Sequence, residues 1–344
     1  MKAAVLYGPN DIRIEQVNKP ICGLNDILLK VKAIGLCGSD IRTITSGHNR
    51  IRYPQIIGHE IAGEIVSIGE RVKKYKLGDR VIVSPIVPCK KCKPCSLGWD
   101  ALCENLINIG TDIPGDYAEY MLIPEIVLEK GTVLPIPETI SYEEAVMTDP
   151  LAAVYACQDD ANITVGNTVV IIGMGPIGNL HAELAKVRGA KTVIAIEQSQ
   201  ERLEMAKDFG ADYLINSKYE DPVKKVRDLT SGWGAEVIIS ACPAIQAQQQ
   251  AISMAAKKGT VIFFGGVAKG MLTEIDTNVI HYNLLTIRGH YAYTNKQLTE
   301  SFEMITSGKL NVKKYVTHKL PLEDVIKGIN LTRTGEAIKV VLEP

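Results

Sequence analysis

The sequence predicts a two-part fold of the α/β plus β class, in which a β-barrel-like domain is joined to a doubly wound parallel sheet. The first observation is a succession of short, β-branched runs bounded by Gly, Pro, Asn or Asp over residues 2–137. The second is the alternation of apolar strand-like runs with helix-length amphipathic segments from about residue 141. The third is size, because 344 residues with 46% hydrophobic content can bury more than one core.

The β-rich part is expected to supply a barrel-like sheet. Its candidate strands are all short and rich in Val, Ile, Leu and Tyr. They cover residues 3–7, 12–17, 26–38, 61–69, 79–85 and 117–124.

The second part is expected to form the parallel sheet. Its strand-like runs cover residues 167–173, 191–197, 213–217, 235–241, 259–266 and 284–289. Segments of helical period, such as residues 177–190 and 200–211, separate them. Six strands alternating with helices predict a doubly wound fold.

The C-terminal tail is expected to return to the first domain. Residues 294–310 have the pattern of a helix and residues 336–344 that of a closing strand, which has no partner in the parallel sheet. The sequence therefore predicts one domain made of residues 1–150 and 287–344, and another made of residues 151–286.

Charge and leader patterns narrow the class of function. The 38 basic and 39 acidic residues give a net charge of −1 without a long like-charged run, which disfavours binding to nucleic acid or to a membrane surface. No apolar stretch is long enough to span a bilayer, and the opening MKAAVLYGPND does not have the pattern of a signal peptide. A cytoplasmic protein acting on small molecules is expected.

Four of the eight cysteines gather in one short segment, PCKKCKPCSLGWDALCEN. In a reducing compartment such a cluster favours a metal over disulfides. The spacing of Cys89, Cys92, Cys95 and Cys103 suits a closed, structural Zn²⁺ site with no position left for substrate. A redox pair or a set of unliganded thiols are the less favoured alternatives.

A nucleotide-binding turn is predicted where the first strand of the parallel sheet meets a helix. The segment GMGPIG places Gly173, Gly175 and Gly178 there, with Pro176 and Ile177 between them. The glycines would permit a tight turn and close approach of a pyrophosphate.

The choice of nucleotide is predicted by an acidic residue about twenty positions further on. Glu197 ends the next strand, can accept both ribose hydroxyls and would repel the extra phosphate of NADP. NAD is therefore expected, while Arg202 leaves an opening for NADP. A chance glycine turn in a flavodoxin-like sheet is the structural alternative.

A second metal set is predicted in the β-rich part. Cys37 follows one strand, and His59 with Glu60 beside it precedes another. A thiolate, an imidazole and a carboxylate would leave one position open at a catalytic Zn²⁺, and Asp149 is the candidate third ligand. Taken singly, each of these residues is more readily explained by packing or by a helix cap. Their occurrence together beside a nucleotide-binding fold is what favours the metal site.

These motifs together resemble the zinc-dependent medium-chain dehydrogenases, and most closely their sorbitol (polyol) and threonine dehydrogenase branch. The resemblance is carried by GHE-x2-G-x5-G from Gly58 to Gly69, by GSD after Cys37, by the four-cysteine segment and by the glycine turn. It implies a GroES-like catalytic domain made from both chain ends, a Rossmann NAD-binding domain, a cleft between them, and a homodimer or homotetramer.

The resemblance also implies roles for single residues. Cys37, His59 and Asp149 would surround a catalytic zinc, with Glu60 exchanging with water in its shell. Ser39 would hydrogen-bond the substrate oxygen, and Asp40 would orient His59. Counting the four-cysteine site, two zinc ions per chain are expected.

Gly265 and Gly266 would let backbone approach the nicotinamide ring. A turn is the plainer explanation of the pair.

Three departures from the family pattern affect these roles. Asp149 is shorter than the usual Glu. Arg42 stands where many relatives carry a proton-accepting His, which makes His48 the substitute candidate. Ala292 precedes Tyr293 where polyol dehydrogenases have an Arg–Tyr pair.

The expected reaction is the interconversion of a secondary alcohol and a ketone by hydride transfer to and from NAD. A polyol, a sugar alcohol or a polyol phosphate is the favoured substrate class. Arg42, Arg50 and Arg52 could receive a phosphate or carboxylate, although loop charges are commonly just solvated. A threonine-type 3-hydroxy amino acid dehydrogenase and, less favoured, a non-catalytic zinc- and NAD-binding protein are the alternatives.

Overall fold

The computed structural model describes residues 1–344, and the chain divides into two units. The first unit consists of Met1–Ala152 and Tyr293–Pro344, and the second of Ala153–Ala292. Strand β16 (Thr286–Gly289) pairs with β15 (Ala255–Phe263), which accounts for residues up to 292 belonging to the second unit.

The first unit is built on a seven-stranded sheet. Its order is β10 (Val133–Pro135), β6 (Arg80–Val83), β5 (Ile61–Ile68), β3 (Ile27–Gly35), β18 (Lys339–Glu343) and β17 (Val316–Pro321), with β9 (Tyr120–Ile123) also paired to β3. Smaller sheets are formed by β2 (Asp11–Gln16), β1 (Lys2–Gly8) and β4 (Gln55–Ile56), and by β7 (Ile86–Val87) and β8 (Ile107–Asn108). The predicted β-rich domain is confirmed.

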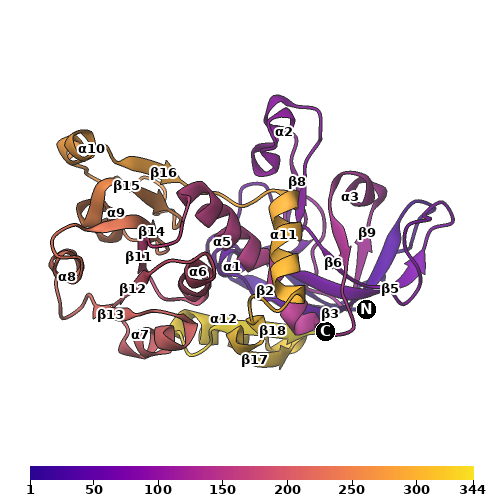
Figure 1. The fold of residues 1–344 in the computed structure, drawn as a ribbon. Helices are drawn as coiled ribbons and strands as arrows, with labels where there is room; N and C mark the ends of the chain where they lie inside the picture. Colours follow the sequence, from indigo (N-terminus) through magenta and orange to yellow (C-terminus); the bar gives the residue numbers. More distant parts are fainter. The chain divides into compact units, whose positions relative to one another are not determined.

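The last strand returns to this sheet, as its sequence predicts. β18 pairs antiparallel with β3 and parallel with β17, so that both chain ends, indigo and yellow in Figure 1, belong to one unit. Most side chains of β3 and β18 are buried. This pairing brings residue 339 into the core that also holds the GHE segment.

Helices of the first unit are mostly short. They are α1 (Gly38–Ser46), α2 (Lys93–Ser96), α3 (Glu125–Lys130), α4 (Tyr142–Ala145), α11 (Asn295–Thr306) and α12 (Val325–Thr334), with 3-10 turns η1 (Asp100–Leu102), η3 (Val312–Tyr315) and η4 (Leu322–Asp324). Helix α5 (Thr148–Ala161) begins in the first unit and continues in the second.

The second unit is a six-stranded parallel sheet. Its order is β13 (Tyr213–Asn216), β12 (Thr192–Glu197), β11 (Thr168–Ile172), β14 (Ala235–Ser240), β15 and β16. The helical segments are α6 (Pro176–Val187), α7 (Gln200–Met205), η2 (Ala206–Phe209), α8 (Pro222–Leu229), α9 (Ile245–Met254) and α10 (Thr277–Asn283). The strand order reverses between β11 and β14, which is where sheets of this kind bind nucleotides.

Alternation along β11 explains why the sheet is covered on both faces. Val169 and Ile171 belong to one buried apolar cluster, while Val170 and Ile172 belong to another. Side chains at even and odd positions of a strand point to opposite faces. The predicted doubly wound sheet is therefore confirmed.

No helix in the structure combines the length and the apolar character that crossing a membrane requires.

Candidate active site and metal centres

The turn from β3 into α1 positions the first metal-type donor. Strand β3 ends at Gly35, and Cys37 lies in extended conformation directly before α1. The Cys37 amide donates to Asp40 Oδ2 at 3.2 Å, which fixes the turn. A Cβ at position 35 would lie 1.8 Å from Glu60 Oε2, so only glycine leaves room for that carboxylate.

The segment before β5 supplies the next two donors. Gly58 has a φ of 100°, and a Cβ there would lie 2.0 Å from Asp116 Oδ1. Glycine tolerates this left-handed conformation without the clash that a Cβ would cause. His59 and Glu60 follow and are directed into the unit beside Cys37.

These three residues form a compact donor set. The ligand atoms of Cys37, His59 and Glu60 all lie within 4.8 Å of one another. One thiolate, one imidazole and one carboxylate are ligands that Zn²⁺ accepts. The hydroxyl of Ser39 lies at the edge of the set, 3.3 Å from Cys37 Sγ and 3.5 Å from His59 Nε2.

Asp40 orients the imidazole ring of His59. His59 Nδ1 lies 3.0 Å from Asp40 Oδ1, and the hydroxyl of buried Tyr117 donates to Asp40 Oδ2 at 3.1 Å. Burial alone would lower the pKa of His59, but the Asp40 carboxylate raises it well above its usual value. With Nδ1–H fixed on Asp40, Nε2 is the nitrogen presented to a metal.

The carboxylate of Glu60 is also suited to binding a metal ion. Its side chain is buried, Oε2 pairs with the ammonium of buried Lys339, and Oε1 is buried with no hydrogen-bond partner. Burial raises the pKa of Glu60, while the charge of Lys339 opposes that rise. A buried carboxylate oxygen without a partner is costly, and a cation at this point would satisfy it.

Asp149 lies outside the three-residue set, near the start of α5. The hydroxyl of Tyr293 donates to its Oδ1. Burial raises the pKa of Asp149 against the opposing charge of His59, and burial raises the pKa of Tyr293 well above its usual value. The phenol is therefore protonated and holds one carboxylate oxygen. Direct ligation by Asp149 stays a prediction.

His48 makes its contacts with the loop after α1. Its Nδ1 accepts from the Arg50 amide at 3.3 Å, and its own amide donates to Tyr53 Oη at 3.1 Å. Burial and the Arg50 charge lower the pKa of His48. Arg50 itself pairs with Asp112, so its guanidinium is engaged. A catalytic role of His48 stays a prediction.

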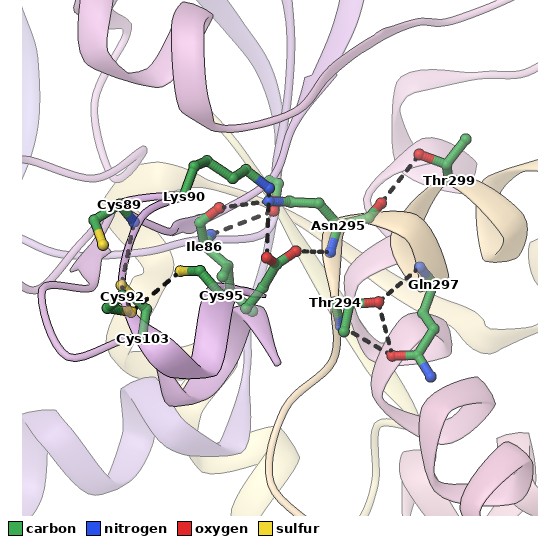
Figure 2. A network of polar contacts seen from close by, with 12 residues as sticks. Ile86, Cys89, Lys90, Cys92, Cys95, Cys103, Thr294, Asn295, Gln297 and Thr299 are labelled. Atoms are coloured by element: carbon green, nitrogen blue, oxygen red, sulfur yellow. Dashed lines mark hydrogen bonds and ion pairs between the residues drawn. The ribbon is translucent and has the colours of Figure 1, made fainter. Parts of the chain in front are cut away.

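The four-cysteine segment forms a second compact donor set, whose side chains turn toward one another in Figure 2. The ligand atoms of Cys89, Cys92, Cys95 and Cys103 all lie within 4.8 Å of one another. The Cys89 and Asn105 amides donate to Cys103 Sγ at 3.1 and 3.4 Å. Backbone N–H groups lower the pKa of Cys89 to about 6. Four sulfurs in one compact set, with backbone N–H groups on Cys89 and Cys103, suit a structural zinc.

The glycine turn follows β11, as predicted. Gly173 has a φ of 97°, and a Cβ on Gly178 would lie 1.9 Å from Gly173 O. Around Gly175, at the start of α6, the position of a Cβ is open, and Pro176 and Ile177 form the first turn. The helix start can therefore receive a phosphate group.

Glu197 stands at the carboxyl end of β12, beside this turn. Its Oε2 accepts from the Met174 amide at 2.9 Å, and its Oε1 accepts from the amides of Gln198 and Ser199 at 2.6 and 3.2 Å. Arg202 lies in the first turn of α7.

The two glycines after β15 differ in the space around them. A Cβ on Gly265 would lie 2.5 Å from Cys242 O, whereas one on Gly266 would meet open space.

Three neighbours of the donor set were not among the predicted site residues. Lys339 begins the final strand and is followed by three apolar residues, and a lysine predicted to be buried requires an anion as partner. Tyr293 precedes a helix start and gives no local signal beyond its family position. Asp116 is buried with both carboxylate oxygens unpartnered, and burial raises its pKa well above the usual value.

Known proteins match the chain over both units. Residues 23–138 match the model of the alcohol dehydrogenase GroES-like domain, and residues 176–307 that of zinc-binding dehydrogenase. The chain is 32% identical to the sorbitol dehydrogenase of Bacillus subtilis (strain 168), with 100% of this chain and 97% of that protein covered. This chain belongs to the zinc-containing medium-chain alcohol dehydrogenases.

Two further proteins that are similar to this dehydrogenase over nearly its whole length are also dehydrogenases. It is 35% identical to the L-threonine 3-dehydrogenase of Pyrococcus horikoshii, covering 99% of this chain and 97% of that one. A solved structure from Sinorhizobium meliloti 1021, described as a zinc-binding dehydrogenase bound to NADP, superimposes with a TM-score of 0.93 at 27% identity over 100% and 99% of the two chains. The dehydrogenase is a zinc-dependent enzyme that oxidises or forms an alcohol with NAD(P).

Proposed function

We propose that the dehydrogenase interconverts a secondary alcohol and the corresponding ketone by hydride transfer to and from NAD. A polyol, a sugar alcohol or a polyol phosphate is the proposed substrate class. The observation that carries the proposal is the hydroxyl of Ser39, which lies within 3.5 Å of both Cys37 Sγ and His59 Nε2. A hydroxyl at the rim of a metal donor set is placed to exchange a proton with a substrate oxygen there.

The metal would be held by Cys37, His59 and a carboxylate, either Glu60 or Asp149. When bound, zinc acts as a Lewis acid that lowers the pKa of an alcohol oxygen. Asp40 keeps the His59 ring oriented, and Lys339 neutralises Glu60 so that the buried set does not carry an excess of negative charge. Ser39 would take up the alcohol proton and pass it outward, with His48 as the candidate acceptor.

NAD is the proposed cofactor, with Glu197 as its selector. The three amides around Glu197 fix its carboxylate at the end of β12. A carboxylate there accepts ribose hydroxyls and repels a 2′-phosphate. Gly173, Gly175, Pro176, Ile177 and Gly178 would take the pyrophosphate, and Gly265 and Gly266 the nicotinamide side. The NADP in one solved relative makes this preference worth testing.

We expect Glu197→Ser to lower kcat/KM with NAD about 10- to 100-fold, because charge-assisted hydrogen bonds to the ribose are lost. The kcat/KM with NADP should rise relative to the kcat/KM with NAD. Glu201→Gln is the matched control, since Glu201 lies on the same turn with its carboxylate on Ser199 Oγ. Steady-state kinetics with both nucleotides measure the effect, and an unchanged preference in Glu197→Ser would refute the assignment.

The second candidate substrate is a threonine-type 3-hydroxy amino acid. It is favoured by the similarity to L-threonine 3-dehydrogenases and by the absence of an arginine at position 292. Arg42 is exposed on α1 and Arg52 on the loop after it, and a guanidinium suits a phosphate and a carboxylate equally. The two candidates therefore differ in which anion, if any, the substrate carries.

A substrate panel distinguishes these candidates. Each compound is oxidised with NAD, and NADH absorbance measures the rate for secondary alcohols, polyols, polyol phosphates and 3-hydroxy amino acids. We expect kcat/KM for the best polyol or polyol phosphate to exceed that for L-threonine by about tenfold or more. A preference for L-threonine would replace the substrate class by the second candidate. No turnover of any member by protein that holds both zinc ions would overturn the proposal.

The proposal also covers the oligomeric state and the cellular location of the dehydrogenase. The outer edge of β16 is unpaired in this chain, and Tyr282, Leu284 and Tyr291 near it are each more than 60% exposed. Such an edge is commonly covered in an assembly. We infer a homodimer or homotetramer, which light scattering of the pure protein tests. All eight cysteines are unpaired, which suits a reducing, cytoplasmic location.

A further inference from the structure

The four-cysteine lobe, residues 89–103, is tied to the start of α11 by a buried polar network (Figure 2). Asp100 Oδ2 accepts from the Asn295 amide at 2.9 Å, and Asn295 Nδ2 donates to Ile86 O at 3.2 Å. Asp100 and Asn295 are each only 7% exposed. A charge-assisted hydrogen bond between two buried groups is strong and directional.

On the lobe side, Asp100 belongs to the turn that presents a cysteine. The Cys103 amide donates to Asp100 O at 3.2 Å, and Cys103 Sγ in turn accepts from the Cys89 amide at 3.1 Å. The ammonium of Lys90 lies 3.4 Å from the other carboxylate oxygen, Asp100 Oδ1. When the four sulfurs hold a metal, the position of Asp100 is fixed with them.

On the helix side, Asp100 meets the first residue of α11. Thr294 caps the helix, with its Oγ1 accepting from the Gln297 amide at 3.2 Å. A carboxylate at a helix start is favoured by the free N–H groups and the helix dipole. The start of α11 is therefore held from the lobe by Asp100 and from within by Thr294.

The residue before this cap is Tyr293, whose hydroxyl donates to Asp149. Tyr293 is 5% exposed, and it follows Ala292, whose φ of 56° is unfavourable for an alanine. The backbone at residue 292 does not by itself prefer this conformation. The position of the Tyr293 ring therefore depends on what holds residues 294 and 295.

We propose that Asp100 is a positioning residue that couples the four-cysteine lobe to the catalytic metal site through Asn295, Tyr293 and Asp149. The proposal rests on the proposed function in taking Asp149 as a partner of the catalytic metal. Asp100 touches neither metal. It fixes the backbone that carries Tyr293, and Tyr293 fixes the carboxylate oxygen of Asp149. The lobe thus sets the geometry of the site in addition to stabilising its own fold.

The test measures metal retention without substrate. Co²⁺ replaces the catalytic zinc of the purified enzyme, and its visible absorption is followed during competition with a chelator. We expect Asp100→Ala to weaken retention about tenfold or more, as losses of groups that orient metal ligands do. Tyr293→Phe should weaken it similarly. The double variant should be no worse than Tyr293→Phe alone, because both changes act through one residue.

Two further variants separate positioning from general damage. Asp100→Asn keeps an oxygen that accepts from the Asn295 amide, so it should restore most of the retention. Glu104→Gln changes an exposed acidic residue directly after the lobe and should behave as the wild type.

Asn295→Pro provides the same measurement if Asp100→Ala does not fold. It removes the backbone N–H that donates to Asp100 Oδ2, at the first position of α11, where a helix tolerates proline. It should weaken Co²⁺ retention about as much as Asp100→Ala, and combining it with Tyr293→Phe should add no further loss. Additive losses, or unchanged Co²⁺ retention and absorption in these variants, would overturn the coupling. Because no substrate is used, that result is independent of which alcohol the enzyme turns over.

Discussion

Cys37→Ser is expected to release one of two zinc ions per chain and to lower kcat/KM about a thousandfold or more. Loss of a Lewis acid from the site removes several kcal/mol of transition-state stabilisation, and each 1.4 kcal/mol is a factor of ten. The second zinc should stay, because its four sulfurs form a separate set. Metal analysis after dialysis and steady-state kinetics measure the two effects together.

Two matched variants make this result specific. Ser39→Ala removes no metal donor, so it should keep both zinc ions and yet lower kcat by about a hundredfold or more. Cys22→Ser changes a cysteine outside both donor sets, whose Sγ lies 3.3 Å from Asp26 O, and should leave zinc content and rate unchanged. Retention of two zinc ions by active Cys37→Ser would remove Cys37 from the catalytic set.

The two domain types could be predicted from the sequence because their signals are local. Period-2 and continuous apolar runs marked the strands of both sheets, and the glycine turn appeared between β11 and α6 as expected. The metal donors were also visible, because Cys and His are uncommon and their neighbouring glycines and acids fit a known pattern. The return of β18 to β3 followed from the absence of a partner in the parallel sheet.

The surroundings of the donor set could not be predicted in the same way. Lys339 reaches Glu60 across 279 positions of the chain, and Tyr293 reaches Asp149 across 144. Such contacts are made by tertiary pairing and have no local periodicity or spacing. Asp149 illustrates the consequence, since the sequence marks it as an acidic candidate while its tyrosine partner emerges only from the fold.

The buried ion pair beside the donor set gives a second large effect. Lys339 and Glu60 are 4% and 1% exposed, whereas the ion pair between Lys319 and Glu143 in the same unit lies at the surface. Removing one member of a buried pair leaves an uncompensated charge in a poorly solvated place, at a cost of about 3–5 kcal/mol. Exposed pairs contribute about 0–1 kcal/mol, because water and salt screen them.

Lys339→Met is therefore expected to lower the free energy of unfolding by about 3–5 kcal/mol, and Lys319→Met by about 1 kcal/mol or less. Urea denaturation followed by circular dichroism measures both. Adding Glu60→Gln to Lys339→Met should recover much of the loss, since no unpaired charge then stays buried. Equal, small losses of unfolding free energy in Lys339→Met and Lys319→Met would mean that the charge of Glu60 is compensated by a group other than Lys339. The ion pair between Lys339 and Glu60 would then not stabilise the first unit.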